Sequence, residues 1–201
     1  MTSPSLNKMY ETKTNITFFE GHSQMCPGET EFLKNIVNNP SIINVMEIGF
    51  NAGHSAELFL SSNKNINLVS FDIGLHNYVN IGKKFIDENY PKRHQLIMGN
   101  SLITVPEFIK TNKKKFDLIF IDGGHDYNIA KGDLINCKKL SHNKTIIIMD
   151  DTMNTPNWIN PWNCGPNRVW KEAKEYYLIK ELGSKDFSKT HGLSWGLFII
   201  S

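Results

Sequence analysis

The chain has 201 residues, enough for one well-buried α/β domain and too few for two domains of ordinary size. Its 40% hydrophobic and 21% charged residues are typical of a soluble globular protein. A formal net charge of +2 is too small to indicate nucleic acid or an anionic membrane as a partner, so we expect neither.

The cysteines and the N-terminus indicate the compartment. Cys26, Cys137 and Cys164 are odd in number and unclustered, which favours reduced thiols over a disulfide framework or a zinc site. The N-terminal residues lack the apolar stretch of a secretory signal, and no apolar run approaches the length of a membrane span. We therefore expect a cytoplasmic protein.

Apolar periodicity and turn residues predict strands and helices that alternate along the chain. Residues 1–15 are polar, and we expect them to be loosely held. The expected strands are residues 42–48, 67–72, 95–98, 116–122, 145–149, 187–190 and 194–200. The expected helices are residues 30–37, 55–60, 78–89, 105–110, 127–140 and 169–182, whereas residues 152–167 show no regular period.

The alternation predicts an α/β fold with a parallel sheet and helices on both faces. The last two strands have no helix between them, so they require antiparallel pairing at the sheet edge. We expect one seven-stranded, mostly parallel sheet with an antiparallel last strand. It forms a single domain of residues 27–201, preceded by an N-terminal segment of residues 1–26.

A strand, a glycine turn and a helix start follow one another around Gly49. Gly49 and Gly53 allow a sharp turn and a close approach of a ligand, which at the start of an α/β sheet predicts a nucleotide or cofactor site. The spacing matches neither the dinucleotide fingerprint nor the phosphate loop. Glu47 suits a cationic or hydrogen-bond-donating ligand, and Asp72, at the end of the next strand, suits two ribose hydroxyls. These features fit S-adenosylmethionine (SAM), with its amino-acid end near Gly49 and its ribose on Asp72.

Three further acids fall at the ends of the fourth and fifth strands. Asp122 ends the fourth strand, and Asp150 and Asp151 follow the apolar run of the fifth. Carboxylates that converge at one sheet edge repel each other unless a cation or donors are present. Their oxygens suit a hard divalent cation such as Mg²⁺, so we expect these three residues to bind one.

The glycine turn and the acid at the end of the second strand resemble the cofactor motifs of class I SAM-dependent methyltransferases. The resemblance implies the Rossmann-like fold of that class, with residues 1–26 as a segment that closes over the cofactor. Asn100 departs from the acid that the family often has near the adenine. The cofactor-binding residues that the resemblance implies are Met25, Glu47, Gly49, Phe50, Asn51, Gly53, His54, Ser55, Asp72, Ile73, Asn100, Ser101 and Asp122.

The acid trio carries a narrower resemblance. Asp122 with Asp150-Asp151 resembles the metal site of the catechol and caffeoyl-CoA O-methyltransferases, which have Asp and then Asp-Asn. It is closer to the macrocin-type sugar O-methyltransferases, which have Asp and then Asp-Asp. This resemblance implies metal-dependent methylation of a hydroxyl on a sugar, a glycan or another vicinal diol. Methylation of a catechol or phenylpropanoid is the alternative.

His125 lies three residues after Asp122, where the catechol type has a lysine that acts as base. Either His125 or Asp122 could remove the hydroxyl proton near neutral pH. We expect Trp158, Trp162 and Asn163, in the irregular segment, to form a wall of the acceptor site, because aromatic faces stack on sugar or aryl rings.

Two questions about assembly and activity complete the expectations. A homodimer is expected because relatives often pair and because Phe18 and Phe19 offer apolar contacts. A non-catalytic SAM-binding scaffold is the alternative from another class of protein. It is disfavoured because a scaffold has no need to concentrate unpaired carboxylates.

Overall fold

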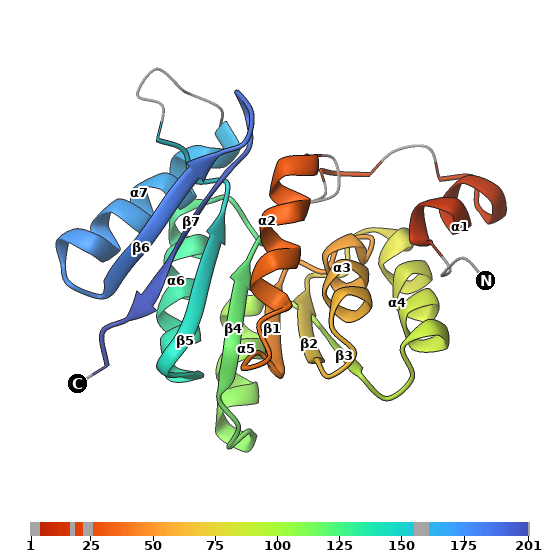
Figure 1. The fold of residues 1–201 in the computed structure, drawn as a ribbon, viewed down its shortest axis with the longest axis horizontal. Coiled ribbons are helices and arrows are strands. Elements are labelled where there is room, and N and C mark those ends of the chain that lie inside the picture. Colours follow the sequence, from red (N-terminus) through yellow and green to blue (C-terminus); the bar gives the residue numbers. More distant parts are fainter. Residues whose placement is uncertain (1–4, 17–18, 22–25, 155–160, 201) are drawn as a thin grey trace.

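The fold is built on one seven-stranded sheet with helices on both sides (Figure 1). The computed structural model describes residues 5–16, 19–21, 26–154 and 161–200. Its strands are β1 (Asn44–Ile48), β2 (Asn67–Asp72), β3 (His94–Met98), β4 (Phe116–Ile121), β5 (Ser141–Asp150), β6 (Ile179–Asp186) and β7 (Gly192–Phe198). Its helices are α1 (Leu6–Lys13), α2 (Pro27–Val37), α3 (His54–Ser62), α4 (Asn77–Asn89), α5 (Ser101–Thr111), α6 (Tyr127–Lys139) and α7 (Pro161–Glu175).

The strands lie in the order β3-β2-β1-β4-β5-β7-β6. β7 runs antiparallel to β5 and β6, and the remaining pairs are parallel. The predicted seven-stranded sheet with an antiparallel last strand is therefore confirmed. β7 nevertheless lies inside the sheet, because it enters between β5 and β6, and β6 forms the edge.

The sheet separates two hydrophobic cores. Helices α1 to α4 pack on one face, against side chains such as Val45 and Phe120, and α5 to α7 pack on the other, against Met46 and Ile119 (Figure 1). Consecutive strand residues thus alternate between two buried faces, which explains the continuous apolar runs of β1, β4 and β5. Within the described ranges, no helix is both long and apolar enough to cross a membrane.

The N-terminal residues are more ordered than expected. Leu6 and Tyr10, four positions apart on α1, are both buried. The Tyr10 hydroxyl donates to the carbonyl oxygens of Ala52 at 3.0 Å and Tyr78 at 2.9 Å, which joins α1 to α4 and to the turn before α3. The expectation of loosely held residues is therefore wrong for residues 6–13, because burial of Leu6 and Tyr10 and the hydrogen bonds of the Tyr10 hydroxyl anchor this short polar helix.

Helix α7 begins and ends earlier than predicted. It starts at Pro161, where the missing N–H of proline costs no helical hydrogen bond, so the expected irregular segment is wrong for residues 161–167. The predicted helix to residue 182 is wrong beyond Glu175. Ile179 and Leu182 have helical spacing, but both lie in strand β6, where Ile179 pairs with Phe198 of β7 and Leu182 lies at a register shift.

The predicted strand over residues 187–190 is a turn. The backbone N–H groups of Phe187 and Ser188 both donate to the carbonyl oxygen of His191, at 2.9 and 3.2 Å, which closes the β6–β7 hairpin. The strand partner of β7 is therefore β6.

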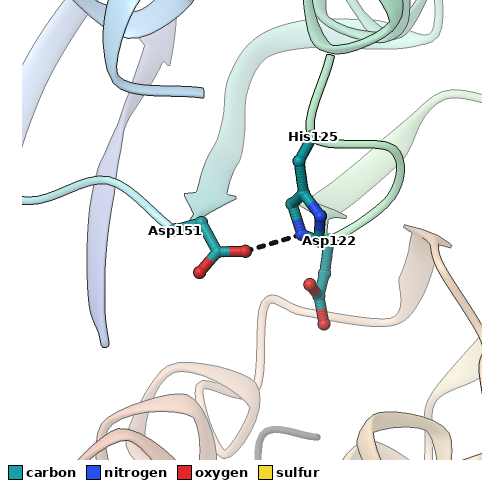
Figure 2. Close-up of side chains that lie close together, drawn as sticks. All are labelled: Asp122, His125 and Asp151. Atoms are coloured by element: carbon teal, nitrogen blue, oxygen red, sulfur yellow. Dashed lines mark ion pairs between the residues drawn. The ribbon is translucent and has the colours of Figure 1, made fainter. Parts of the chain in front are cut away.

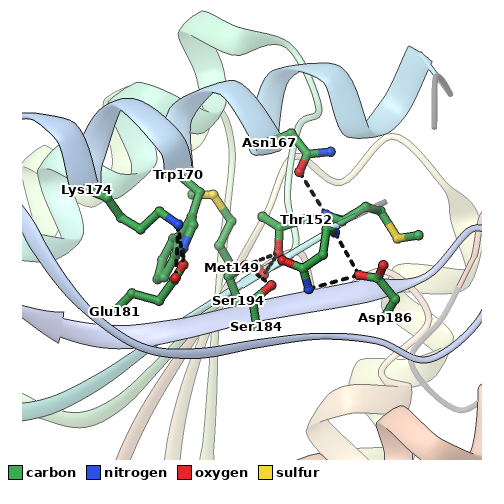
Figure 3. A network of polar contacts seen from close by, with 11 residues as sticks. Met149, Thr152, Asn167, Trp170, Lys174, Glu181, Ser184, Asp186 and Ser194 are labelled. Carbon is green, nitrogen blue, oxygen red and sulfur yellow. Dashed lines mark hydrogen bonds and ion pairs between the residues drawn. The ribbon is translucent and has the colours of Figure 1, made fainter. Parts of the chain in front are cut away.

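Polar side chains join this hairpin to the segment after β5 (Figure 3). The Thr152 hydroxyl donates to the Ser194 hydroxyl on β7 at 2.7 Å. Asp186, at the end of β6, accepts from the backbone N–H of Asn154 at 2.9 Å. These bonds fix the chain directly after the two acids that end β5.

Candidate functional site

A cavity of about 670 Å³ opens at the carboxyl ends of β1, β2, β4 and β5. This is the edge at which open α/β sheets bind ligands. Among the described residues with a predicted role, those that line it are Gly49, Asn51, Asp72, Ile73, Asn100, Ser101, Asp122, His125, Asp150, Asp151 and Trp162.

Gly49 allows the ends of β1 and β4 to meet beneath the cavity. Its φ is +100°, and a Cβ at this position would lie 1.8 Å from the carbonyl oxygen of Asp122. The neighbouring backbone is hydrogen-bonded on both sides: Asp122 N–H donates to the Ile48 carbonyl at 2.9 Å, and Gly49 N–H donates to the Phe71 carbonyl at 2.8 Å. Only glycine fits this crossing, which brings the predicted cofactor turn next to the first predicted metal ligand.

The carboxylate of Asp72 is oriented by two backbone donors. One oxygen accepts from Asn51 N–H and the other from Gly74 N–H, both at 2.7 Å. Each carboxylate oxygen retains further lone-pair capacity on the cavity side. Asp72 is therefore fixed in position and able to accept hydroxyl hydrogens.

Asn51 has a second connection, to the N-terminal segment. Its side-chain amide donates to the carbonyl oxygens of Glu20 and Gly21, both at 2.8 Å. Both residues line the cavity, and the Glu20 carboxylate lies 3.3 Å from Nε2 of His76. We call Glu20 and Gly21 the N-terminal strap. Its predicted role as part of a cofactor lid stays a prediction.

Glu47 lies behind the cavity. It is fully buried and accepts from the hydroxyls of Ser55 at 2.7 Å and Ser70 at 2.6 Å. Burial raises the pKa of Glu47 to about 7, against the opposing effect of these two hydrogen bonds. Glu47 holds the start of α3 against β2, and it is not among the described residues that line the cavity.

Four other predicted cofactor residues also lie outside the described cavity lining. His54 contacts the Asn7 side chain at 2.8 Å, Phe50 stacks on the His94 ring, and Ser55 bonds Glu47. Gly53 caps α3 with a φ of +92°. These residues shape the turn from behind. Met25 lies outside the described residues.

The predicted metal ligands and the predicted base come together at the ends of β4 and β5. Nε2 of His125 lies 2.8 Å from a carboxylate oxygen of Asp151 (Figure 2). Ligand atoms of Asp122, His125 and Asp151 all lie within 4.8 Å of one another. Asp151 holds the left-handed φ of 58°, and its N–H donates to Asp150 at 2.7 Å. Strain of this kind is concentrated at functional sites.

Burial and mutual repulsion set the charges of this cluster. They raise the pKa of Asp150 to about 8, with Asp151 the strongest neighbouring charge, and that of Asp122 well above its usual range. The hydrogen bond to Asp151 raises the pKa of His125. Oxygen donors that repel each other in this way fit a divalent cation, which would replace the protons they otherwise need.

Glu29, which no sequence motif indicated, also lines the cavity. It lies in the first turn of α2 and is 1% exposed. Burial, followed by the charge of Asp150, raises its pKa to about 10. The available signal was spacing: Glu29, Leu33 and Val37 recur every four residues and form the buried face of α2.

The predicted acceptor wall is only partly present. Trp162, in the first turn of α7, is 42% exposed and lines the cavity. Asn163 is fully buried, and its amide has no hydrogen-bond partner among the described residues. The expectation that Asn163 faces the acceptor is wrong, because helix α7 turns its side chain inward. Trp158 lies outside the described residues.

A protein-family model described as a methyltransferase domain matches residues 46–152, more than half of the chain. This range runs from the glycine turn through the three aspartates and ends at Thr152. A comparison with curated proteins finds no match.

Solved structures share the fold over nearly the whole chain. An O-methyltransferase from Bacillus cereus in complex with SAH is 20% identical, with a TM-score of 0.74 and coverage of 98% of this chain and 93% of that one. TomG from Streptomyces achromogenes, solved with SAM, is 14% identical, with a TM-score of 0.74 and coverage of 96% and 88%. CalS11, a TDP-rhamnose 3′-O-methyltransferase, is 17% identical, with a TM-score of 0.65 and coverage of 97% and 92%. The Rossmann-like fold implied by the sequence motifs is confirmed.

Proposed function

Because the chain belongs to the methyltransferase domain family, we propose that it transfers the methyl group of SAM to a hydroxyl oxygen with the help of a divalent cation. One observation carries this proposal: residues that suit SAM and residues that suit a cation line the same cavity. Gly49 and Asp72 suit SAM, and Asp122, Asp150 and Asp151 suit the cation.

The cofactor half of the cavity is built by β1, β2 and the turns after them. Asp72, oriented by two backbone N–H groups, accepts the ribose hydroxyls. Ile73 and Asn100 line the cavity and would contact the adenine end, and Gly49 would leave room for the amino-acid end. The neighbouring carboxylates complement the positive sulfonium of SAM, whereas the sulfur of the product SAH is an uncharged thioether.

The cation half is built by β4 and β5. Asp122, Asp150 and Asp151 would hold a cation such as Mg²⁺, which acidifies an acceptor hydroxyl and fixes its position when bound. The transfer forms a carbon–oxygen bond on the acceptor and breaks the carbon–sulfur bond of SAM, and the hydroxyl proton passes to the protein.

The proton acceptor is His125 or Asp122. His125 is held by Asp151 at 2.8 Å and remains partly exposed to the cavity, so it can receive a proton and pass it to solvent. Asp122 also lines the cavity, and its carboxylate can accept the hydroxyl proton. Trp162 offers an aromatic face to the acceptor ring from α7.

We infer that the acceptor carries two adjacent hydroxyls and is a sugar or glycan, because the chain has Asp150-Asp151 where the catechol type has Asp-Asn. A catechol or phenylpropanoid is the second candidate. We also propose a cytoplasmic location and a homodimer.

The metal requirement is tested with Asp150→Asn and with EDTA. We expect formation of SAH from SAM, in the presence of a panel of nucleotide sugars and catechols, to stop in EDTA and to return with Mg²⁺. Asp150→Asn is nearly isosteric and should lose about 100-fold or more in turnover while it remains folded. Asp87→Asn, an exposed acid on α4, is the matched control.

Turnover that is undiminished in EDTA would refute the cation and leave His125 as the base acting alone. The acceptor that supports turnover decides between sugar and catechol.

A further inference from the structure

Glu29 is a buried acid with one carboxylate oxygen that is unpaired among the described residues. Its side chain is 1% exposed, it points into the cavity from α2, and its Oε1 has no hydrogen-bond partner among the described residues. A buried polar group left unpaired is costly, and a buried carboxylate more so. A side chain placed in this way indicates that something else belongs beside it.

The charged groups around Glu29 indicate that its missing partner is a cation. Glu29 lines the same cavity as Asp122, Asp150 and Asp151, and the charges of Asp150 and Asp151 oppose its ionisation. The same acids repel Asp122. Four carboxyl groups therefore share one cavity, and within the described part of this cluster an ion pair joins His125 to Asp151. A cation between them would pair every carboxylate at once.

We propose that Glu29 supplies a fourth carboxylate to the cation site, so that the cation is bound between α2 and the ends of β4 and β5. This inference rests on the proposed metal-dependent function and extends it to a helix outside the strand ends. With four carboxylates, the roughly six positions of an octahedral cation leave two for adjacent acceptor oxygens.

The arrangement links three distant parts of the chain. Glu29 precedes β1, whereas Asp122 directly follows β4 and Asp150 ends β5. A bound cation would therefore connect α2 to the ends of β4 and β5, and it would stabilise the position of α2 at the cavity.

Calorimetric titration with Mn²⁺, in the absence of SAM and acceptor, tests the assignment. Glu29→Gln removes the charge and keeps the size of the side chain, and we expect it to lower the Mn²⁺ affinity at least about tenfold. Glu31→Gln makes the same change on the exposed side of the same helix and should leave the affinity at the wild-type value. Circular dichroism verifies that each variant is folded.

Glu29→Leu is the second variant, because an apolar side chain of similar size suits the buried position if glutamine does not. Wild-type Mn²⁺ affinity in a folded Glu29→Gln or Glu29→Leu protein overturns the assignment and leaves the proposed function intact. If the wild-type protein binds no Mn²⁺, both the assignment of Glu29 and the proposed metal-dependent function are overturned.

Discussion

Asp72 shows how one residue at a strand end prepares a ligand site. The N–H groups of Asn51 and Gly74 hold its two oxygens before any ligand arrives, so little side-chain freedom remains to be lost on binding. Asn51 adopts a positive φ of 51° at this turn, which a short polar side chain tolerates. The orientation of this carboxylate is therefore a property of the backbone.

Replacing Asp72 with alanine should weaken SAM binding by more than about tenfold, because a charged group accepting hydroxyl hydrogen bonds is worth roughly 1.5–3 kcal/mol. Calorimetric titration with SAM measures the effect, and Asp87→Ala serves as the exposed control. Equal SAM affinities of the wild type and Asp72→Ala would show that Asp72 does not bind the ribose.

At the scale of elements, the strand ends were predictable and the helices only partly so. Parallel strands deliver their carboxyl ends to one edge, so the positions of Asp72, Asp122 and Asp150 in sequence sufficed to group them. The location of Glu29 in the cavity was not predicted, because Glu29 lies on a helix that precedes the sheet and the rule for strand ends does not apply to it. The burial of Asn163 was not predicted, because the rotation of α7 about its axis depends on packing between distant segments.

The errors in secondary structure have one cause. β6 carries its charged residues in two adjacent pairs and its apolar residues Ile179 and Leu182 at helical spacing, so its local pattern does not predict a strand until β7 provides a partner. Helix α1 is polar over most of its length, and the contacts of Tyr10 with distant carbonyls decide its stability. In both cases tertiary contacts override local propensity.

Tyr10→Phe should destabilise the protein by roughly 1–2 kcal/mol, because it leaves the buried carbonyl oxygens of Ala52 and Tyr78 without their donor. Urea unfolding followed by circular dichroism gives the value. Tyr176→Phe, at a position 73% exposed, is the control and should leave the unfolding midpoint in place. Equal midpoints for the two variants would show that α1 contributes nothing through this hydroxyl.

At the scale of the whole molecule, a buried polar chain makes stability depend on pH. His94 shares the Ser70 hydroxyl with Glu47, and burial, its largest influence, lowers the pKa of His94 to about 3. The unfolded chain takes up this proton near pH 6.5, so His94 favours unfolding increasingly as the pH falls from 6.5 to 3. Glu47, whose pKa is raised to about 7, acts in the opposite sense: its contribution is lost as the pH rises from about 4.5 to 7.

The two contributions are separable below pH 4.5, where only that of His94 still changes. The free energy of unfolding of the wild type, measured relative to that of His94→Gln, should fall by up to about 1.4 kcal/mol per pH unit between pH 4.5 and 3. Urea unfolding across this range provides the comparison. Parallel pH profiles of the two proteins would mean that His94 takes up its proton in the folded state.

The position of β6 at the sheet edge has a consequence for how copies of the chain behave at high concentration. An edge strand exposes unpaired backbone groups that can recruit a strand from another molecule. β6 carries Lys180, Glu181, Lys185 and Asp186 along eight residues, and charges on an edge oppose such recruitment. The charges of β6 therefore oppose the addition of a strand from another molecule at this edge. We expect them to limit aggregation of the folded protein through β6.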